Sequence, residues 1–135
     1  PRPRLRAAAR GVERHARCVA RHRRRNNTML RIYPVLLSLI DSVQPLLSQL
    51  ERHDPDLARQ CRRALSSAPL NLAEGSYSQG RNRKAHYYNA LGSLREALAC
   101  FEVAAAHRYL PPVEPQLARQ FNHVLGTLVR LVGGH

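Results

Sequence analysis

The stretch "APLNLAEGSYSQG", residues 68–80, combines a helical pattern with a residue that interrupts helices. Apolar residues at positions 61, 65, 68 and 72 recur every three or four positions, as one face of a helix requires. Pro69 has no N–H to donate to the carbonyl of Leu65, and its ring crowds the preceding turn. The pattern therefore predicts either two helices that meet here or one helix, over about residues 55–78, that is kinked at Pro69.

The same spacing of apolar residues continues on both sides of this stretch and predicts three more helices, over residues 31–51, 82–109 and 117–131. Their apolar positions are Ile32, Leu36, Leu39, Val43, Leu46 and Leu50; Tyr87, Leu91, Leu94, Leu98, Phe101 and Ala105; and Leu117, Phe121, Val124, Leu128 and Leu131. Pro45 predicts a kink in the first of these helices or a break into two pieces. Asp54 is a plausible N-cap before Pro55. No segment alternates with period two, so the expected fold is all-α, an antiparallel up-down-up-down four-helix bundle whose second helix is kinked at a proline.

Positive charge is concentrated at the N-terminus. The chain has 135 residues and a net charge of +13. Residues 1–28 hold ten arginines and one acid, Glu13, whereas residues 29–135 hold twelve basic and eight acidic residues. The arm is open to two interpretations: a basic segment that folds on RNA, DNA or an anionic membrane, or sequence upstream of a native start at Met29, the only methionine. We expect the second, with an Arg-rich arm at 1–28 that is disordered or non-native and a bundle domain at 29–135. An organellar transit peptide fits less well, because the arm has little serine.

The cysteines and histidines do not form a convincing metal site. Cys61 and Cys100 fall on apolar helical positions and are expected to pack as small hydrophobic residues. His15, Cys18 and His22 have helical spacing, but a fourth ligand is missing, so we expect no metal and no cofactor. An odd number of cysteines without a signal peptide favours the cytoplasm. No apolar run is long enough for a membrane span, and no membrane partner is expected.

A polar motif follows Pro69. Asn71 and Glu74 are three residues apart and share a helix face. They could pair with Arg95 or Ser93 on the next helix, or cap each other. Without a nucleophile, a metal cluster or a phosphate loop beside them, we interpret them as a structural network and expect no enzyme activity.

A basic corner, "GRNRKAHYY" at residues 80–88, is the candidate for binding. It places Arg81, Arg83 and Lys84 at the start of a helix, where phosphate groups bind readily. The predicted nucleic-acid-binding set is Arg81, Arg83, Lys84, Arg59, Arg62 and Arg63, with Tyr77, Tyr87 and Tyr88 available to stack on bases. The alternative is a solvated loop whose tyrosines lie in the core.

Residues 66–110 resemble the bacterial four-helix-bundle family encoded by intervening sequences in large-subunit ribosomal RNA genes, a family related to the accessory variability proteins of diversity-generating retroelements. The residues that carry the resemblance are Pro69, Asn71, Ala73, Glu74 and Gly75, then Gly92, Ser93 and Glu96, then Tyr109 and Leu110. The resemblance implies a homo-oligomer, with a ring-like pentamer as the expected form. For the retroelement relatives it implies a partner role with RNA and a reverse transcriptase. The chain departs from the family in its N-terminal arm and in Pro45.

Two functions are compatible with these observations. The first is a non-enzymatic, oligomeric protein that binds RNA or other nucleic acid through basic surface residues, as an accessory to a reverse transcriptase if it resembles the retroelement relatives. The second is a protein–protein interaction scaffold whose charge serves only solubility. An RNA-processing enzyme lacks a residue set to carry it.

Overall fold

The structure is a computed structural model that describes residues 13, 17 and 31–133. The chain divides into two compact units, Pro1–Arg31 and Ile32–His135. In the first unit, the two described residues before Arg31 are helical. The predicted character of residues 1–28, including the histidine and cysteine spacing there, otherwise lies outside the described residues.

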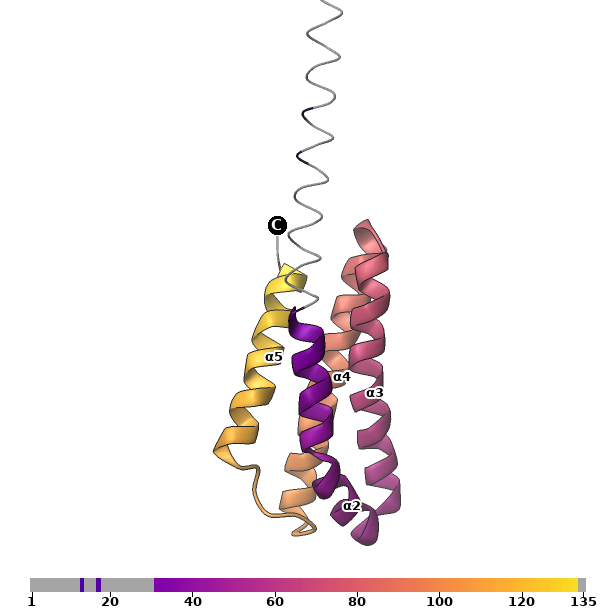
Figure 1. Ribbon diagram of the computed structural model, residues 1–135. Helices are drawn as coiled ribbons and strands as arrows, with labels where there is room; N and C mark the ends of the chain where they lie inside the picture. Colours follow the sequence, from indigo (N-terminus) through magenta and orange to yellow (C-terminus); the bar gives the residue numbers. More distant parts are fainter. Residues whose placement is uncertain (1–12, 14–16, 18–30, 134–135) are drawn as a thin grey trace, which may run out of the picture. The chain divides into compact units, whose positions relative to one another are not determined.

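The described part of the second unit is helical apart from short connectors, and it contains no strand. The helices are residues 32–42, α2 (Gln44–His53), α3 (Pro55–Tyr77), α4 (Gly80–Ala106) and α5 (Pro115–Gly133) (Figure 1). The prediction of an all-α protein is therefore confirmed. Predicted and observed ends of the helices differ by only a few residues in α3 and α4.

The first predicted helix is broken rather than merely kinked. Residue 43 is a turn, and α2 begins one residue later with Pro45 in its first turn. A proline fits there because the first turn of a helix has no intrahelical acceptors for its N–H groups. The side chains of Ser42 and Gln44 donate to the carbonyls of Leu39 and Ile40, at 2.8 and 2.9 Å, and satisfy acceptors around the break. Figure 1 shows the chain changing direction where α2 begins.

Helix α3 begins as predicted. The Asp54 side chain accepts a hydrogen bond of 3.0 Å from the backbone N–H of Leu57, and Pro55 follows as a first-turn residue. This is an N-cap, which satisfies one of the unpaired N–H groups at a helix start. Pro69 is buried inside α3, which continues through it as one helix.

The core is built of leucine, alanine, valine and two phenylalanines, Phe101 and Phe121, which pack edge to face. Most of the predicted apolar positions are buried. Near the ends of helices the buried position moves by one residue: Leu47 is buried instead of Leu46, and Val132 instead of Leu131. A strict seven-residue pattern drifts around a helix of 3.6 residues per turn, so such shifts accumulate along its length.

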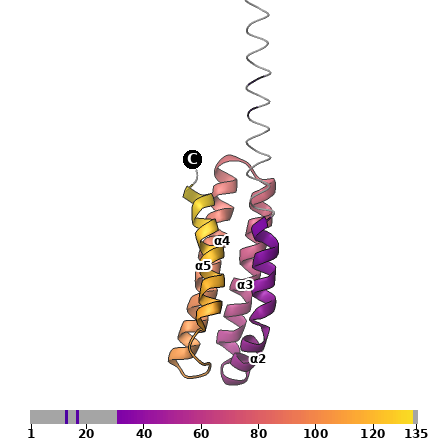
Figure 2. The same cartoon turned by 60° about the vertical axis from the view of Figure 1, so that its left-hand side comes forward.

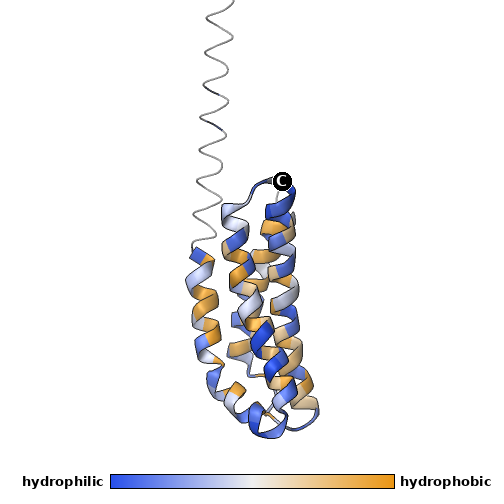
Figure 3. Cartoon of the chain, turned by 90° about the vertical axis from the view of Figure 1, so that its right-hand side faces the viewer, coloured by the Kyte–Doolittle hydropathy of each residue, from blue (hydrophilic) through white to orange (hydrophobic). Residues whose placement is uncertain are grey.

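Helices adjacent in the chain pack against each other: α2 against α3, α3 against α4, and α4 against α5 (Figure 2). Only Ser78 and Gln79 separate α3 from α4, so α4 returns beside α3. In Figure 3, hydrophobic and hydrophilic residues occupy different sides of the helices. The α3–α4 pair carries the polar motif and the basic corner, and it is the part of the fold that positions the candidate site.

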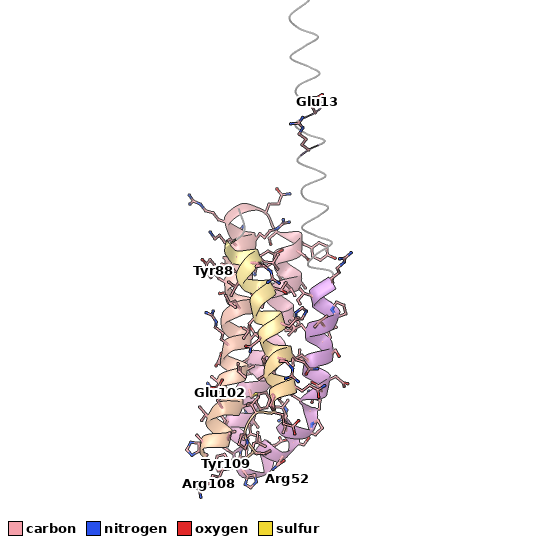
Figure 4. The ribbon with its side chains drawn as sticks, turned by 90° about the vertical axis from the view of Figure 1, so that its left-hand side faces the viewer. Glu13, Arg52, Tyr88, Glu102, Arg108 and Tyr109 are labelled. Carbon is pink, nitrogen blue, oxygen red and sulfur yellow. The ribbon has the colours of Figure 1, made fainter. Side chains whose placement is uncertain are left out.

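Tyr109 organises the connector between α4 and α5. Its ring stacks on the rings of His53 and His107, with centroids 5.5 and 5.1 Å apart, and its backbone N–H donates to the carbonyl of Ala104 at 2.9 Å. Arg108 takes a left-handed conformation with φ of 61° to allow this turn. The Tyr109–Leu110 pair of the sequence motif is thus a helix-ending structure, and Figure 4 places Tyr109 far along the ribbon from Tyr88.

Candidate nucleic-acid interface

The polar motif forms a hydrogen-bond network between α3 and α4. Asn71 Nδ2 donates to the backbone carbonyl of Ser67 at 3.0 Å and to its hydroxyl at 3.1 Å. The Ser93 hydroxyl, on α4, donates to the Ser67 hydroxyl at 2.8 Å. Ser93 thus joins the network through Ser67, which connects the two helices, and not through Asn71 or Glu74 as predicted. The network lies within one turn of Pro69, where the helix lacks one backbone hydrogen bond.

The network continues to His86, which the sequence did not identify. Asn71 Oδ1 and Glu74 Oε2 each lie 3.2 Å from His86 Nδ1. The orientation of the Asn71 amide follows from Ser67, whose carbonyl can only accept, so Oδ1 must face the histidine. Two acceptors therefore face Nδ1, and this nitrogen carries the proton. The cross-helix partner of Asn71 and Glu74 is therefore His86, and neither Arg95 nor Ser93, the two predicted partners, bonds to them directly in the described hydrogen bonds. Glu74, 66% exposed at its side chain, lies at the outer edge of the network.

Gly75 and Glu96, the other members of the motif, have different roles. Gly75 is buried against Tyr87 of α4, where a Cβ would lie 2.5 Å from Cε1 of the ring. A glycine is therefore required for this close approach of the two helices. Glu96 is exposed and accepts a 3.1 Å hydrogen bond from Gln60 Nε2, so it links α4 to α3 outside the network around Pro69.

Arg83, one of the six predicted binding residues, is buried instead of exposed. Only 8% of the surface of Arg83 is exposed to solvent. Arg83 Nε lies 3.2 Å from the carbonyl of Gly75 and 2.8 Å from that of Ser78, and one terminal nitrogen lies 3.3 Å from the carbonyl of Ser76. These carbonyls end α3, where backbone acceptors lack helical partners. Arg83 thus holds the α3–α4 turn, and the structure removes it from the exposed basic surface that the sequence predicted.

The arginines on α3 differ in their partners. Arg59 pairs with Asp56 at 3.0 Å, and Arg62 pairs with Glu51 at 2.9 Å. The hydrogen bond and charge of Arg62 hold the pKa of Glu51 below its ordinary value. Both pairs are exposed to solvent, so they reduce the positive charge of this face more than they stabilise the fold.

Arg63, Arg81 and Lys84 are exposed, and no ion pair found among residues 31–133 includes any of them. Arg63 contributes to a polar groove of about 500 Å³ along α3 and α4, where it shares the lining with carboxylates at Asp56 and Glu96. The groove is therefore mixed in charge. Arg81 and Lys84 lie in a different setting, since residues 75–94 contain no acidic residue.

The three tyrosines near the corner separate into two groups. Tyr87 is buried in the core, as the alternative interpretation of the sequence expected. Tyr77 is 93% exposed at the end of α3, and Tyr88 is 53% exposed on α4. Two aromatic rings are thus available to a partner. Figure 4 shows Tyr88 projecting from α4.

Sequence reasoning missed one basic residue of this region. Arg95 is exposed on α4, and no ion pair in the described helices includes it. The signal was present in the sequence, because Arg95 follows Tyr88 by seven residues and Tyr88 follows Arg81 by seven. These three residues share one side of α4.

Neither a metal centre nor a reactive thiol is found in the described helices. No group of three or more histidine, cysteine, aspartate or glutamate side chains among the described residues could hold a metal ion. Cys61 and Cys100 are buried as predicted, and burial raises the pKa of both thiols. Within the part of the chain that the structure describes, no helix combines the length and apolar character needed to cross a membrane.

Comparison with known proteins gives one family. A family model described as 23S rRNA-intervening sequence protein matches residues 29–129, which include all of α2, α3 and α4 and most of α5. No curated protein and no solved structure matches the chain.

Proposed function

Because the chain belongs to the 23S rRNA-intervening sequence protein family, we propose that it is a non-enzymatic, oligomeric protein that binds RNA through exposed basic side chains. The family name associates these proteins with ribosomal RNA genes, which is compatible with an RNA ligand. The single observation that carries the proposal is the cluster of exposed cations without acidic neighbours on α4, Arg81 and Lys84. Phosphate groups are the ligands that such unpaired cations attract.

The revised binding set differs from the one that the sequence predicted. Arg63, Arg81 and Lys84 remain as exposed cations, and Arg95 joins them. Arg59 and Arg62 contribute less because carboxylates already neutralise them. The N-terminal segment adds nine net positive charges that would increase the affinity for RNA without selecting a sequence.

Exposed apolar side chains support an oligomer. Leu70 on α3 is 62% exposed, and Val103 on α4 and Val129 on α5 are each 45% exposed. Single exposed apolar residues are common on protein surfaces, but large ones on several helices favour burial against other subunits. We propose a homo-oligomer, with a ring-like pentamer as its form, in which weak contacts from each subunit sum along one RNA.

The finer fold and cellular role belong to the same proposal. The helices would form an up-down-up-down four-helix bundle, with 32–42 and α2 together as its first helix and a kink in α3 at Pro69. The protein would act in the cytoplasm and, if it shares the role of the diversity-generating retroelement proteins, would bind a reverse transcriptase. The alternative is a protein–protein interaction scaffold with no nucleic-acid ligand, which the same exposed apolar residues would serve.

Binding of labelled RNA across a salt series tests the proposal. If basic residues contact phosphates, the logarithm of the binding constant falls with the logarithm of salt concentration, by about 0.7 per contact for a single strand and about 0.9 for a duplex. A scaffold without an RNA ligand would show no binding beyond that of residues 1–28, which a chain starting at Met29 removes. Light scattering after gel filtration gives the subunit number of the same sample.

A further inference from the structure

One exposed side of α4 combines cations with an aromatic ring. Arg81, Lys84, Tyr88, Gly92 and Arg95 follow each other by three or four residues, and all five are exposed. At 3.6 residues per turn they fall within an arc of about 80°, and at 1.5 Å per residue they span about 21 Å. This side of α4 is called the 81–95 stripe below.

The 81–95 stripe carries three cations and no acid. None of its three cations takes part in an ion pair within the described residues. Glu96 follows Arg95 but lies about 40° beyond the edge of the stripe and accepts a hydrogen bond from Gln60. The next acid in line with the stripe is Glu102, two turns beyond Arg95, and Figure 4 shows it lower on the ribbon than Tyr88. The stripe thus attracts an anionic chain along its length rather than a compact anion at one point.

Position 92, one turn after Tyr88 on the same side of α4, carries no side chain. Side chains on a helix lean toward its N-terminus, so a side chain at position 92 would cover the turn that carries Tyr88. A Cβ at Gly92 would meet no atom within 4 Å, so packing within the subunit does not require a glycine there. A glycine inside a helix nevertheless costs about 1 kcal/mol relative to alanine. A glycine at this position keeps the space beside the Tyr88 ring open to a ligand, which would offset this cost.

From these observations we infer that the 81–95 stripe binds single-stranded RNA, with one base stacked on Tyr88 and phosphates contacted by Arg81, Lys84 and Arg95. This inference rests on the proposed RNA-binding function and names its substrate class and contacts. A single strand fits because its bases present their faces to an exposed ring, whereas a duplex keeps those faces stacked inside. A protein partner is the alternative occupant, and the test below separates the two.

The test uses the full chain and a fluorescein-labelled, unstructured single strand of RNA, measured by fluorescence anisotropy, with the same strand annealed to its complement as the duplex probe. Tyr88→Leu removes the aromatic face but keeps apolar area, and should weaken single-strand binding by roughly five- to 100-fold. Tyr88→Phe keeps the ring and should bind like the parent. Gly92→Met should weaken binding as well, because it covers the ring without removing any charge.

Replacing Arg81, Lys84 and Arg95 together with alanine should lower the salt slope for the single strand by about 2. The matched control replaces Arg59 and Arg62, two arginines already paired with carboxylates, and should change the slope less.

Three results for Tyr88→Leu would overturn the inference. The variant could bind the single strand like the parent, or it could lose as much affinity for the duplex as for the single strand. It could also change only the subunit number. The last result would assign the stripe to a protein interface. If the parent chain binds neither RNA probe, the proposed function itself fails. If it binds RNA but the stripe variants bind equally well, only the inference fails.

Discussion

The backbone of Gly75 on α3 lies directly against the ring of Tyr87 on α4. A Cβ on Gly75 would lie 2.5 Å from Cε1 and 2.7 Å from Cδ1 of this ring, and 3.2 Å from the Cβ of His86. Real Cβ atoms do not approach a ring so closely, so Gly75→Ala must move α3, α4 or the buried tyrosine. Overpacking of this kind costs about 1–3 kcal/mol. Urea denaturation followed by circular dichroism should show this loss.

Gly92→Ala is the matched control for Gly75→Ala. Both glycines lie inside helices, but a Cβ at Gly92 meets nothing within 4 Å. Alanine there should raise the free energy of unfolding by about 0.5–1 kcal/mol, because it favours the helix and adds no clash. If the two variants changed stability equally, close approach at Gly75 would not be the reason for that glycine.

The network around Pro69 gives a second prediction. Asn71→Ala removes the group that joins Ser67 to His86 and leaves polar groups at the α3–α4 interface without partners, at a cost of about 1–3 kcal/mol. Glu74→Ala should cost less, about 0.5 kcal/mol, because Glu74 is largely exposed and its contact competes with water. Thermal melts of the two variants show which substitution lowers stability more. A larger loss for Glu74→Ala would contradict the outer position that the structure gives to this residue.

The sequence predicted the helices well because the apolar residues at helical spacing are mostly the ones that the core buries. It did not decide between a kink and a break at Pro45, since both satisfy a proline that lacks an N–H. The predicted spacing still places Val43 and Leu50 in the core on either side of the break, and only Leu46 gives way to its neighbour Leu47. Pro69 shows the opposite outcome, because α3 continues through it as one helix.

The candidate site was harder to predict because one-dimensional patterns do not show which charges meet. Arg81 and Arg83 look equivalent in "GRNRK", yet two residues along a helix is about half a turn, so one faces solvent and the other the carbonyls that end α3. Arg62 looks like a surface cation until the turn at Asp54 brings Glu51 beside it. The role of His86 could not be predicted from the sequence, because it depends on how closely α3 and α4 approach each other.

The buried thiols predict a dependence of stability on pH. Burial raises the pKa of Cys61 and, to a lesser extent, that of Cys100 above the ordinary value of 9.0. Above pH 9 an unfolded thiol loses its proton while the folded one keeps it, so folding is opposed by up to about 1.4 kcal/mol per pH unit for each thiol. Stability should be constant in this respect below pH 9 and fall above it. The difference between the parent and a Cys61→Ala, Cys100→Ala variant isolates this effect from other groups that titrate in the same range.

Thiol labelling provides an independent check. The thiolate is the reactive form, so a disulfide reagent at pH 8 should modify Cys61 and Cys100 slowly in the folded protein and rapidly in urea. A Cys18→Ser background keeps the count to these two residues. Rapid labelling of both without denaturant would contradict their burial.

A chain that starts at Met29 should fold on its own. The family match begins at residue 29, and the buried residues found in the described chain begin at Ile32. The removed segment carries a net charge of +9, so its loss lowers repulsion within the chain. Helical circular dichroism and a cooperative melt should both be retained. A non-cooperative melt would show that residues 1–28 contribute to the core.

Arg83 gives the last prediction, and it separates a structural arginine from a binding one. Its guanidinium donates to carbonyls of Gly75, Ser76 and Ser78, so Arg83→Ala leaves several acceptors at the end of α3 without their donor. Hydrogen bonds to a charged group contribute about 1.5–3 kcal/mol, and the free energy of unfolding should fall by this order.

Arg83→Lys should not restore the loss, because an ammonium cannot reproduce the planar fork that reaches three carbonyls. Arg81→Ala, two residues away and exposed, is the control and should melt like the parent while losing affinity for RNA. Replacing Arg83 together with its neighbours would therefore mix an unfolding effect with a binding effect, so only variants that keep Arg83 report on the surface. If Arg83→Ala melted like the parent and lost RNA binding instead, the arginine would belong to the interface after all.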